Sequence, residues 1–361
     1  MSPEAVRQRS ALRLAFAATL ALVWGAMAGE PLPGLTAVIA IQVLAGMPRP
    51  PGLRQAMTLV AVIALTAGAA FAVSMVFADR LLMLTAALGL LFYLGFTVRE
   101  RAAGRPSLPA TMLLNATAVV PVLTFQAEVL GAGVVETLVT AAIRAIVVVW
   151  LLYALLPAPL DMPTAAAPAG PGPGGGIPTT QIGRTARILA KVAIVLPAQL
   201  FYLAEPSALA FPALLGLVTF LSAQDPTAGR TQLVILLLGN LVGSAAAAAA
   251  ATLLEIGPPL PALSLLALLG SLEFARWIMI AGRRPGGAVA LTGLVTFLTL
   301  FGLSASPTSF AVPVLDRVTD ILVLSLYTIA ASTLLLPTAV PGSLPPWRGT
   351  RAPTPCRQGS G

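Results

Sequence analysis

Apolar runs long enough to cross a lipid bilayer recur along almost the whole chain, separated by short polar or proline-containing turns. A helix needs about 20 apolar residues to span a hydrocarbon core of about 30 Å. The first six candidate spans are Ala11–Ala28, Leu32–Met47, Leu53–Phe77, Leu81–Val98, Leu108–Gln126 and Ala132–Leu156. The next six are Thr185–Ala204, Ser207–Ser222, Thr231–Leu254, Leu260–Ala281, Gly286–Leu303 and Val312–Leu336. The pattern predicts an all-α integral membrane protein of about twelve transmembrane helices.

Two stretches are rich in proline, glycine and alanine: one separates the spans into two halves, and the other follows the last span. Such a composition cannot form a packed core, so it predicts a flexible linker and a disordered tail. The short second span of each half is predicted to be strongly bent or an incomplete crossing. The predicted organisation is an N-terminal segment 1–10, a first six-helix repeat 11–156, a linker 157–184, a second six-helix repeat 185–336 and a tail 337–361.

The two halves carry the same order of features. Glu205-Pro206 follows Glu30-Pro31 at a distance of 175 residues, and each pair separates a long span from a short one. A proline-containing basic turn then leads into another long span. Six spans per repeat is an even number, so this order predicts two parallel repeats related by a pseudo-two-fold axis along the membrane normal. Such repeats place a transport cavity between the halves, and the alternative is duplication into a larger scaffold.

Composition and charge agree with a membrane protein. The 361 residues are 57% hydrophobic and only 9% charged, against about 25% charged residues in a soluble domain. The net charge of +8 comes from basic residues that stand singly between apolar runs, which excludes a nucleic-acid-binding face. Because these residues fall in alternate loops, the positive-inside rule predicts that both termini are cytoplasmic.

The start of the chain needs a separate interpretation. Arg7 and Arg9 precede an apolar run that ends in Ala26-Met27-Ala28, which resembles a secretory signal with its cleavage site. The first span nevertheless has a counterpart at the start of the second half, which favours a retained helix.

Several kinds of chemistry are excluded by the residues that the chain lacks. It has no histidine, a single cysteine at Cys356, and no glycine-rich phosphate loop before its one lysine, Lys191. These absences exclude a disulfide framework, histidine-based metal sites and a Walker A nucleotide site. We therefore predict no enzymatic activity and no cofactor, and expect any energy to come from an ion gradient or another subunit.

The turns around the two short spans resemble a known family. The first copy runs Glu30-Pro31-Leu32-Pro33-Gly34-Leu35-Thr36 through Gln42 to Met47-Pro48-Arg49-Pro50-Pro51-Gly52-Leu53-Arg54, and the second runs from Glu205-Pro206 to Asp225-Pro226-Thr227-Ala228-Gly229-Arg230. These stretches resemble the fusaric-acid-resistance and aromatic-acid-exporter superfamily, in particular a short branch of unassigned function without soluble domains. The resemblance implies efflux of small organic acids or drug-like compounds, driven by the proton gradient, with a periplasmic membrane-fusion adaptor as partner.

Charged side chains inside the predicted spans are the first candidates for a transport site, because charge within a bilayer is costly. Arg144 lies about 18 Å into the sixth span, and its planar guanidinium suits a carboxylate substrate. Glu273 and Arg276 share one face of the tenth span, where Glu273 would carry the coupling proton. The alternatives are that Glu273 and Arg276 neutralise each other, or that Arg144 pairs with Glu273. Glu30 and Glu205 are interpreted as markers of outer turns.

Uncharged polar groups and prolines supply further cavity-lining candidates. These are Asn115, Gln199, Asn240, Gln42, Pro121 and Pro197. The alternative is that the amides bond to neighbouring helices and that the prolines are tolerated kinks. Gly239 and Gly243 form a GxxxG pattern that favours close packing within the monomer, with a homo-oligomer as the alternative.

The sequence as a whole favours a secondary exporter of organic anions. A non-transport scaffold or assembly component of an envelope complex is the first alternative. A permease subunit of an ATP-driven pump is the second, although the short basic loops offer no obvious coupling helix.

The predicted topology can be tested directly. Reporter fusions in the linker around Gly174 and after Gly361 should both report the cytoplasmic side, because each half has an even number of predicted spans. A periplasmic signal from the tail would contradict both the even span count and the two-repeat organisation.

Overall fold

The computed structural model describes eleven helices and no strand within residues 3–30, 32–46, 49–102, 107–126, 133–157, 181–204, 214–215, 217–218, 221–222, 226–254, 259–282, 284–304 and 314–335. The first six helices are α1 (Pro3–Met27), α2 (Pro33–Gly46), α3 (Leu53–Val76), α4 (Leu81–Arg101), α5 (Leu108–Gln126) and α6 (Val134–Leu155). The others are α7 (Gln181–Ala204), α9 (Pro226–Leu254), α10 (Pro259–Ala281), α11 (Pro285–Ser304) and α12 (Val314–Leu335).

Eight of these helices are long and apolar enough to cross a membrane. They are α1, α3, α4, α6, α7, α9, α10 and α11. The chain is therefore all-helical and has the character of a multi-pass membrane protein, surrounded by a lipid bilayer. The expected count of twelve spans is corrected to eight within the described part of the chain. Most of the predicted span 207–222 lies outside the described residues.

Three further helices are apolar but shorter over their described residues. The 14 residues of α2 extend only about 21 Å, which is less than a bilayer core. The described apolar segment of α5 is Pro109–Phe125 and that of α12 is Leu326–Leu335.

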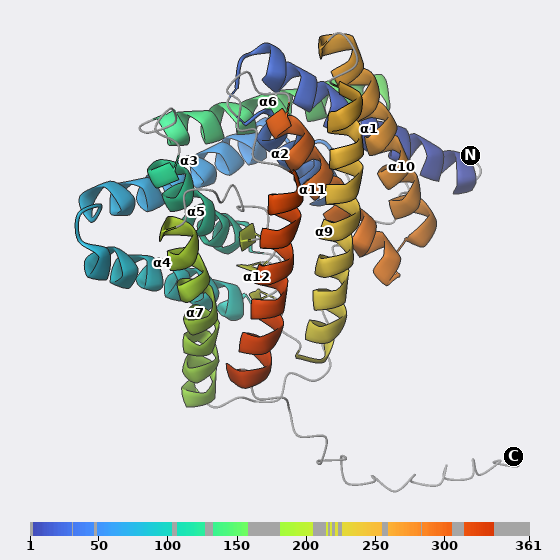
Figure 1. Cartoon of the computed structure of the whole chain (residues 1–361). Coiled ribbons are helices and arrows are strands. Elements are labelled where there is room, and N and C mark those ends of the chain that lie inside the picture. Colours follow the sequence, from blue (N-terminus) through green and yellow to red (C-terminus); the bar gives the residue numbers. More distant parts are fainter. Residues whose placement is uncertain are drawn as a thin grey trace, which may run out of the picture.

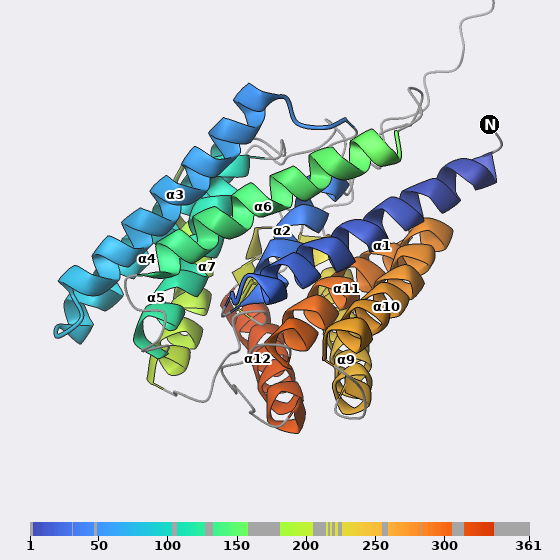
Figure 2. The ribbon, with the colours of Figure 1, turned by 90° about the horizontal axis from the view of Figure 1, so that it is seen from above.

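The helices run in more than one direction. In Figure 1, α3, α4 and α6 lie across the view, whereas α7, α9 and α12 run down it. Seen from above in Figure 2, α1, α6 and α3 lie side by side, and α10 follows α1 on its other flank. The packing of α1 against both α6 and α10 gives it a central place among the helices that form the candidate site.

The buried apolar residues form two cores, and each core draws helices from both halves. The larger core joins α1, α2, α3, α5 and α6 to α9, α10 and α11. The smaller core joins α4 and α5 to α7, α12 and residues 214–221. The halves 11–156 and 185–336 are thus packed through one another, which is not the arrangement of two six-helix units that each enclose a core of their own.

Glycine allows a close crossing of α9 and α11. Gly239 and Gly243 of α9 face α11, where an added Cβ would lie 2.6 Å from the Cβ of Thr292 and 2.8 Å from the Cβ of Thr296. Thr296 also donates a hydrogen bond of 2.7 Å to Oδ1 of the buried Asn240. The GxxxG pattern is used within the monomer, as a small-residue contact that lets two backbones approach.

We predict that Gly243→Ala lowers the stability of the protein by about 1–3 kcal/mol, because the new methyl group overpacks the crossing and displaces Thr296 from Asn240. Thermal unfolding of the detergent-solubilised protein measures the effect. Gly68→Ala in α3 is the matched control, since a Cβ there meets nothing within 4 Å. Equal stabilities for the two variants would show that the α9–α11 crossing is not tightly packed.

Candidate functional site

A carboxylate lies in the break between α1 and α2. Helix α1 ends at Met27, and Gly29 takes a positive φ of 66° that an L side chain adopts only with strain. This turn brings the chain back on itself, so that the Glu30 amide donates a hydrogen bond of 3.0 Å to the Gly25 carbonyl. The Glu30 side chain is consequently directed inward, and the residue is only 6% exposed.

Two polar groups hold the buried Glu30 carboxylate. The Nη1 atom of Arg144 in α6 donates to its Oε1 and forms an ion pair with it. The hydroxyl of Thr36 in α2 donates to its Oε2 over 2.9 Å. A side chain at Gly25 would place its Cβ 2.6 Å from Oε2, so the glycine leaves the space that the carboxylate occupies. The Glu30 carboxylate thus joins α1, α2 and α6 at one point.

The two members of this ion pair differ in exposure. The Glu30 side chain is 5% exposed, whereas that of Arg144 is 26% exposed. Away from water, an unpaired carboxylate or guanidinium is costly, so each charge stabilises the other. The Arg144 side chain is thus the more accessible member of the pair.

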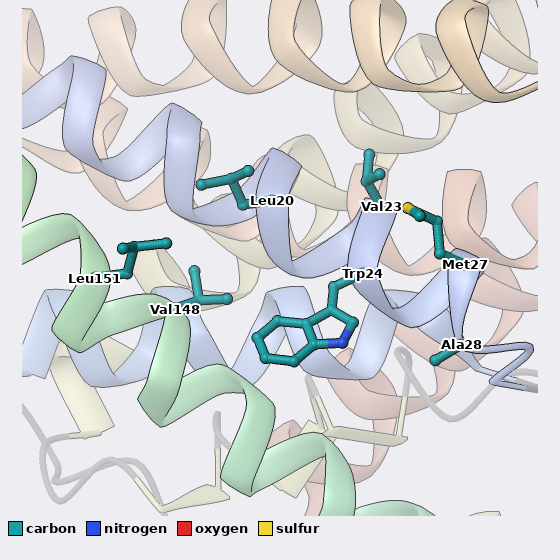
Figure 3. A pocket seen from close by; sticks show the side chains of 7 residues that line it. All are labelled: Leu20, Val23, Trp24, Met27, Ala28, Val148 and Leu151. Carbon is teal, nitrogen blue, oxygen red and sulfur yellow. The ribbon is translucent and has the colours of Figure 1, made fainter.

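An apolar groove adjoins the ion pair between α1 and α6. It has a volume of about 360 Å³ and is lined by Leu20, Val23, Trp24, Met27, Ala28, Val148 and Leu151. Figure 3 shows the Trp24 ring directed from α1 toward α6 and lying between the two helices. Val148 lies one helical turn after Arg144, and Ala28 lies two residues before Glu30. Residues one turn apart share a helix face, so Arg144 lies on the α6 face that lines the groove, although neither member of the ion pair lines the groove itself.

This arrangement permits exchange of anions at Arg144. A planar guanidinium can bind two carboxylates, or can release one to take another of the same geometry. An incoming carboxylate would compete with Glu30 for the guanidinium. The apolar groove next to it can hold the remainder of an amphipathic molecule.

The other charged candidates lie elsewhere. Glu273 and Arg276 form an ion pair of 3.2 Å with each other along α10, with side chains that are 72% and 61% exposed. Glu273 and Arg276 therefore neutralise each other, which was one of the two alternatives to a transport role in the sequence analysis. Arg144 is brought together with Glu30, a residue that we had interpreted only as the marker of an outer turn.

The uncharged candidates are dispersed over the structure. Asn240 bonds Thr296, and Gln199 is fully buried in α7 with neither amide atom hydrogen-bonded. Asn115 is half-buried in α5 and Gln42 is exposed on α2, while Pro121 is buried inside α5 and Pro197 is exposed on α7. None of these six residues lines the α1–α6 groove.

Two buried cations were not identified from the sequence. Lys191 of α7 forms an ion pair of 3.2 Å with Glu100 of α4, and both side chains are less than a tenth exposed. Arg13 of α1 lies over the ring of Tyr153, 4.8 Å from its centroid. The positive-inside pattern counted both cations with the cytoplasmic segments. The sequence signal of their burial is that the residues directly before and after each cation are apolar.

Metal-ligating residues do not cluster in the part of the chain that the structure describes. No group of three His, Cys, Asp or Glu side chains comes together there. The site therefore consists of an ion pair, a hydroxyl and an apolar groove.

Comparison with known proteins finds one partial similarity. A family described as a protein of unknown function, DUF2955, matches residues 10–152. No curated protein matches the chain, and no solved structure matches it. The matched segment contains Glu30, Thr36, Arg144 and the whole groove, so the site falls entirely inside the part of the chain that resembles this family.

We predict that Glu30→Gln and Arg144→Gln each lower the free energy of unfolding by about 3 kcal/mol, because each leaves one charge without its partner. The double variant should recover most of this loss, since it leaves no unpaired charge. A double-mutant cycle in detergent measures the coupling.

The pair Glu273 and Arg276 provides the matched control for that cycle. Both side chains are exposed, so a cycle with Glu273→Gln and Arg276→Gln should give a coupling of about 0.5 kcal/mol or less. Coupling of equal size in the two cycles would contradict the assignment of Glu30–Arg144 as the buried pair.

Proposed function

We propose that the protein is a secondary-type transporter of small organic anions, with Arg144 and Glu30 as its central binding and coupling groups. The observation that carries this proposal is the ion pair itself: a buried carboxylate, a partly exposed guanidinium and an apolar groove at one place in a chain of membrane-crossing helices. Ionisable groups inside membrane proteins mark substrate or ion pathways.

The ion pair favours transport over a purely structural role. A buried pair is weak support for stability, because well-packed apolar residues often stabilise a core equally well. Here the guanidinium is partly open and adjoins an apolar groove of a size suited to a small ligand. A scaffold or assembly component of an envelope complex has no need for that combination, and it remains the second candidate function.

Several finer features belong to the same proposal. By resemblance to the fusaric-acid-resistance and aromatic-acid-exporter superfamily, we place the protein in the bacterial inner membrane with both termini cytoplasmic. Transport would be proton-coupled efflux of organic acids or drug-like compounds, with a periplasmic membrane-fusion adaptor as partner. A homo-oligomer is compatible with this arrangement.

The packing of the helices supports an internal repeat as part of the proposal. Helix pairs α3–α5, α4–α5 and α3–α6 of the first half have the counterparts α9–α11, α10–α11 and α9–α12 in the second. The contact of α1 with α10 likewise corresponds to that of α7 with α4. Exchange of the halves by a pseudo-two-fold axis would produce this pattern, and movement of one half against the other is the usual basis of alternating access in such repeats.

Flux measurements in proteoliposomes test the proposal. Radiolabelled benzoate, cinnamate and phthalate should cross vesicles that contain the protein faster than protein-free vesicles at a pH where each acid is ionised. We predict that Arg144→Gln lowers the protein-dependent flux roughly tenfold or more, since a bidentate anion contact is lost.

The control is the double variant Glu273→Gln/Arg276→Gln, which should retain the flux of the wild type. Absence of protein-dependent flux for all three acids, with a folded protein in the vesicles, would favour the scaffold over the transporter.

A further inference from the structure

We propose that the α1–α6 groove binds a single-headed amphipathic organic anion that enters from the lipid, and that Glu30 takes up one proton when this anion occupies Arg144. The inference rests on the proposed function and specifies its ligand, its route of entry and its coupling. The ligand class is an apolar body with one carboxylate or sulfonate.

The lining of the groove defines the body of the ligand. All seven lining residues are apolar apart from the indole nitrogen of Trp24, and the volume is about 360 Å³. Ligand pockets in proteins span about 300–1,000 Å³, so this groove suits a small ligand. An aliphatic chain or a single aromatic system fills it without burying an unpaired polar group.

The groove opens on the outer surface of the helices. Trp24 is 40% exposed, Met27 is 70% exposed and Leu151 is 47% exposed. In a bilayer these side chains of α1 and α6 face lipid, since α1 and α6 are both candidate spans. A ligand that is dissolved in the membrane can therefore reach the groove laterally.

Charge complementarity selects an anion over a neutral amphiphile. Arg144 precedes the lining residue Val148 by one helical turn, its partner Glu30 follows the lining residue Ala28 by two residues, and 26% of the Arg144 side chain is exposed. An amphipathic anion with its body along Trp24 and Val148 would place its head group against the Arg144 guanidinium. A neutral amphiphile of the same shape gains the apolar contacts alone.

Occupation of Arg144 by a second anion changes the state of Glu30. Thr36 is an uncharged partner and cannot replace the guanidinium as a counter-charge. The described parts of α2 and α11 carry no charged residue, and Glu273 and Arg276 of α10 pair with each other on an exposed face. On α6, Glu136 is exposed, and the charged residues of α1 lie in its first half. A buried carboxylate that loses its counter-charge binds a proton.

The direction of coupling follows from this linkage. Anion and proton are bound together, so a carrier that crosses the membrane when loaded moves both in the same direction. The proton therefore accompanies the anion and does not exchange for it. This differs from the efflux driven by the proton gradient that the family resemblance implies: efflux through this site is still coupled to a proton, but it runs down the concentration gradient of the acid and against an inward proton gradient.

Trp24 provides a direct readout of occupancy. A bromine-labelled decanesulfonate should quench the fluorescence of the full-length protein in nanodiscs with a saturable component that Trp24→Phe removes. The sulfonate stays ionised at all pH values of interest, so any proton taken up belongs to the protein. Bromine-labelled decanol, at the same bilayer concentration, should show no saturable component.

Two variants distinguish binding of the head group at Arg144 from proton uptake at Glu30. Arg144→Gln should weaken the saturable binding roughly tenfold or more. Glu30→Gln should retain the binding, because it leaves the guanidinium free for the probe. In weakly buffered solution with an indicator dye, the wild type should take up about one proton per bound probe and Glu30→Gln none.

The pH dependence gives an independent check. Because binding takes up a proton, wild-type affinity for the sulfonate should fall by as much as about tenfold per pH unit as pH rises. The affinity of Glu30→Gln should not vary over the same pH values. Should Arg144→Gln fail to fold, Glu30→Gln/Arg144→Gln leaves no unpaired charge and tests the same contact.

Each part of the proposal has an outcome that would overturn it. Equal quenching by decanol and the sulfonate would show that the groove is an ordinary lipid-facing surface filled by any acyl chain. Binding of the probe without proton uptake, or equal proton uptake by Glu30→Gln, would refute the proposed coupling of anion binding to protonation of Glu30. Intact binding and proton uptake without flux in proteoliposomes would instead refute the transporter and leave this inference standing.

Discussion

An arginine in the middle of a membrane-crossing helix must have a counter-charge, and this requirement organises the first half of the protein. Arg144 of α6 obtains it from Glu30, 114 residues earlier in the chain. To deliver that carboxylate, α1 has to stop at the positive-φ glycine Gly29, and α2 has to begin close by, so that Thr36 reaches the second oxygen. The break between α1 and α2 is thus coupled to the charge on α6.

Helical order could be predicted from the sequence because it depends on local properties. Runs of apolar residues bounded by glycine and proline gave helices close to their expected positions throughout the described chain. The number of full crossings could not be obtained in this way. A run such as Leu108–Gln126 is helical over its whole length and packs against α3, α4 and α7. Hydropathy predicts such a helix, but the neighbours against which it packs depend on tertiary contacts that no local pattern records.

The candidate site was only half predictable for the same reason. Glu273 and Arg276 are three residues apart, so their pairing follows from helix geometry alone. The partner of Arg144 depends on how α1 and α6 pack, and no local pattern records that. Lys191 and Glu100 give a second example, because they are 91 residues apart in the chain and the pair is buried between α7 and α4.

The internal repeat that we propose would not be symmetric at the position of Arg144. When the ends of α6 and α12 are aligned at Leu155-Leu156-Pro157 and Leu335-Leu336-Pro337, the residue that corresponds to Arg144 is Leu324. Leu324 is buried in the smaller core and has no charge to offer an anion. The candidate anion site would therefore belong to the first half only. In the transporter that we propose, the second half would then supply the surface against which the first half moves.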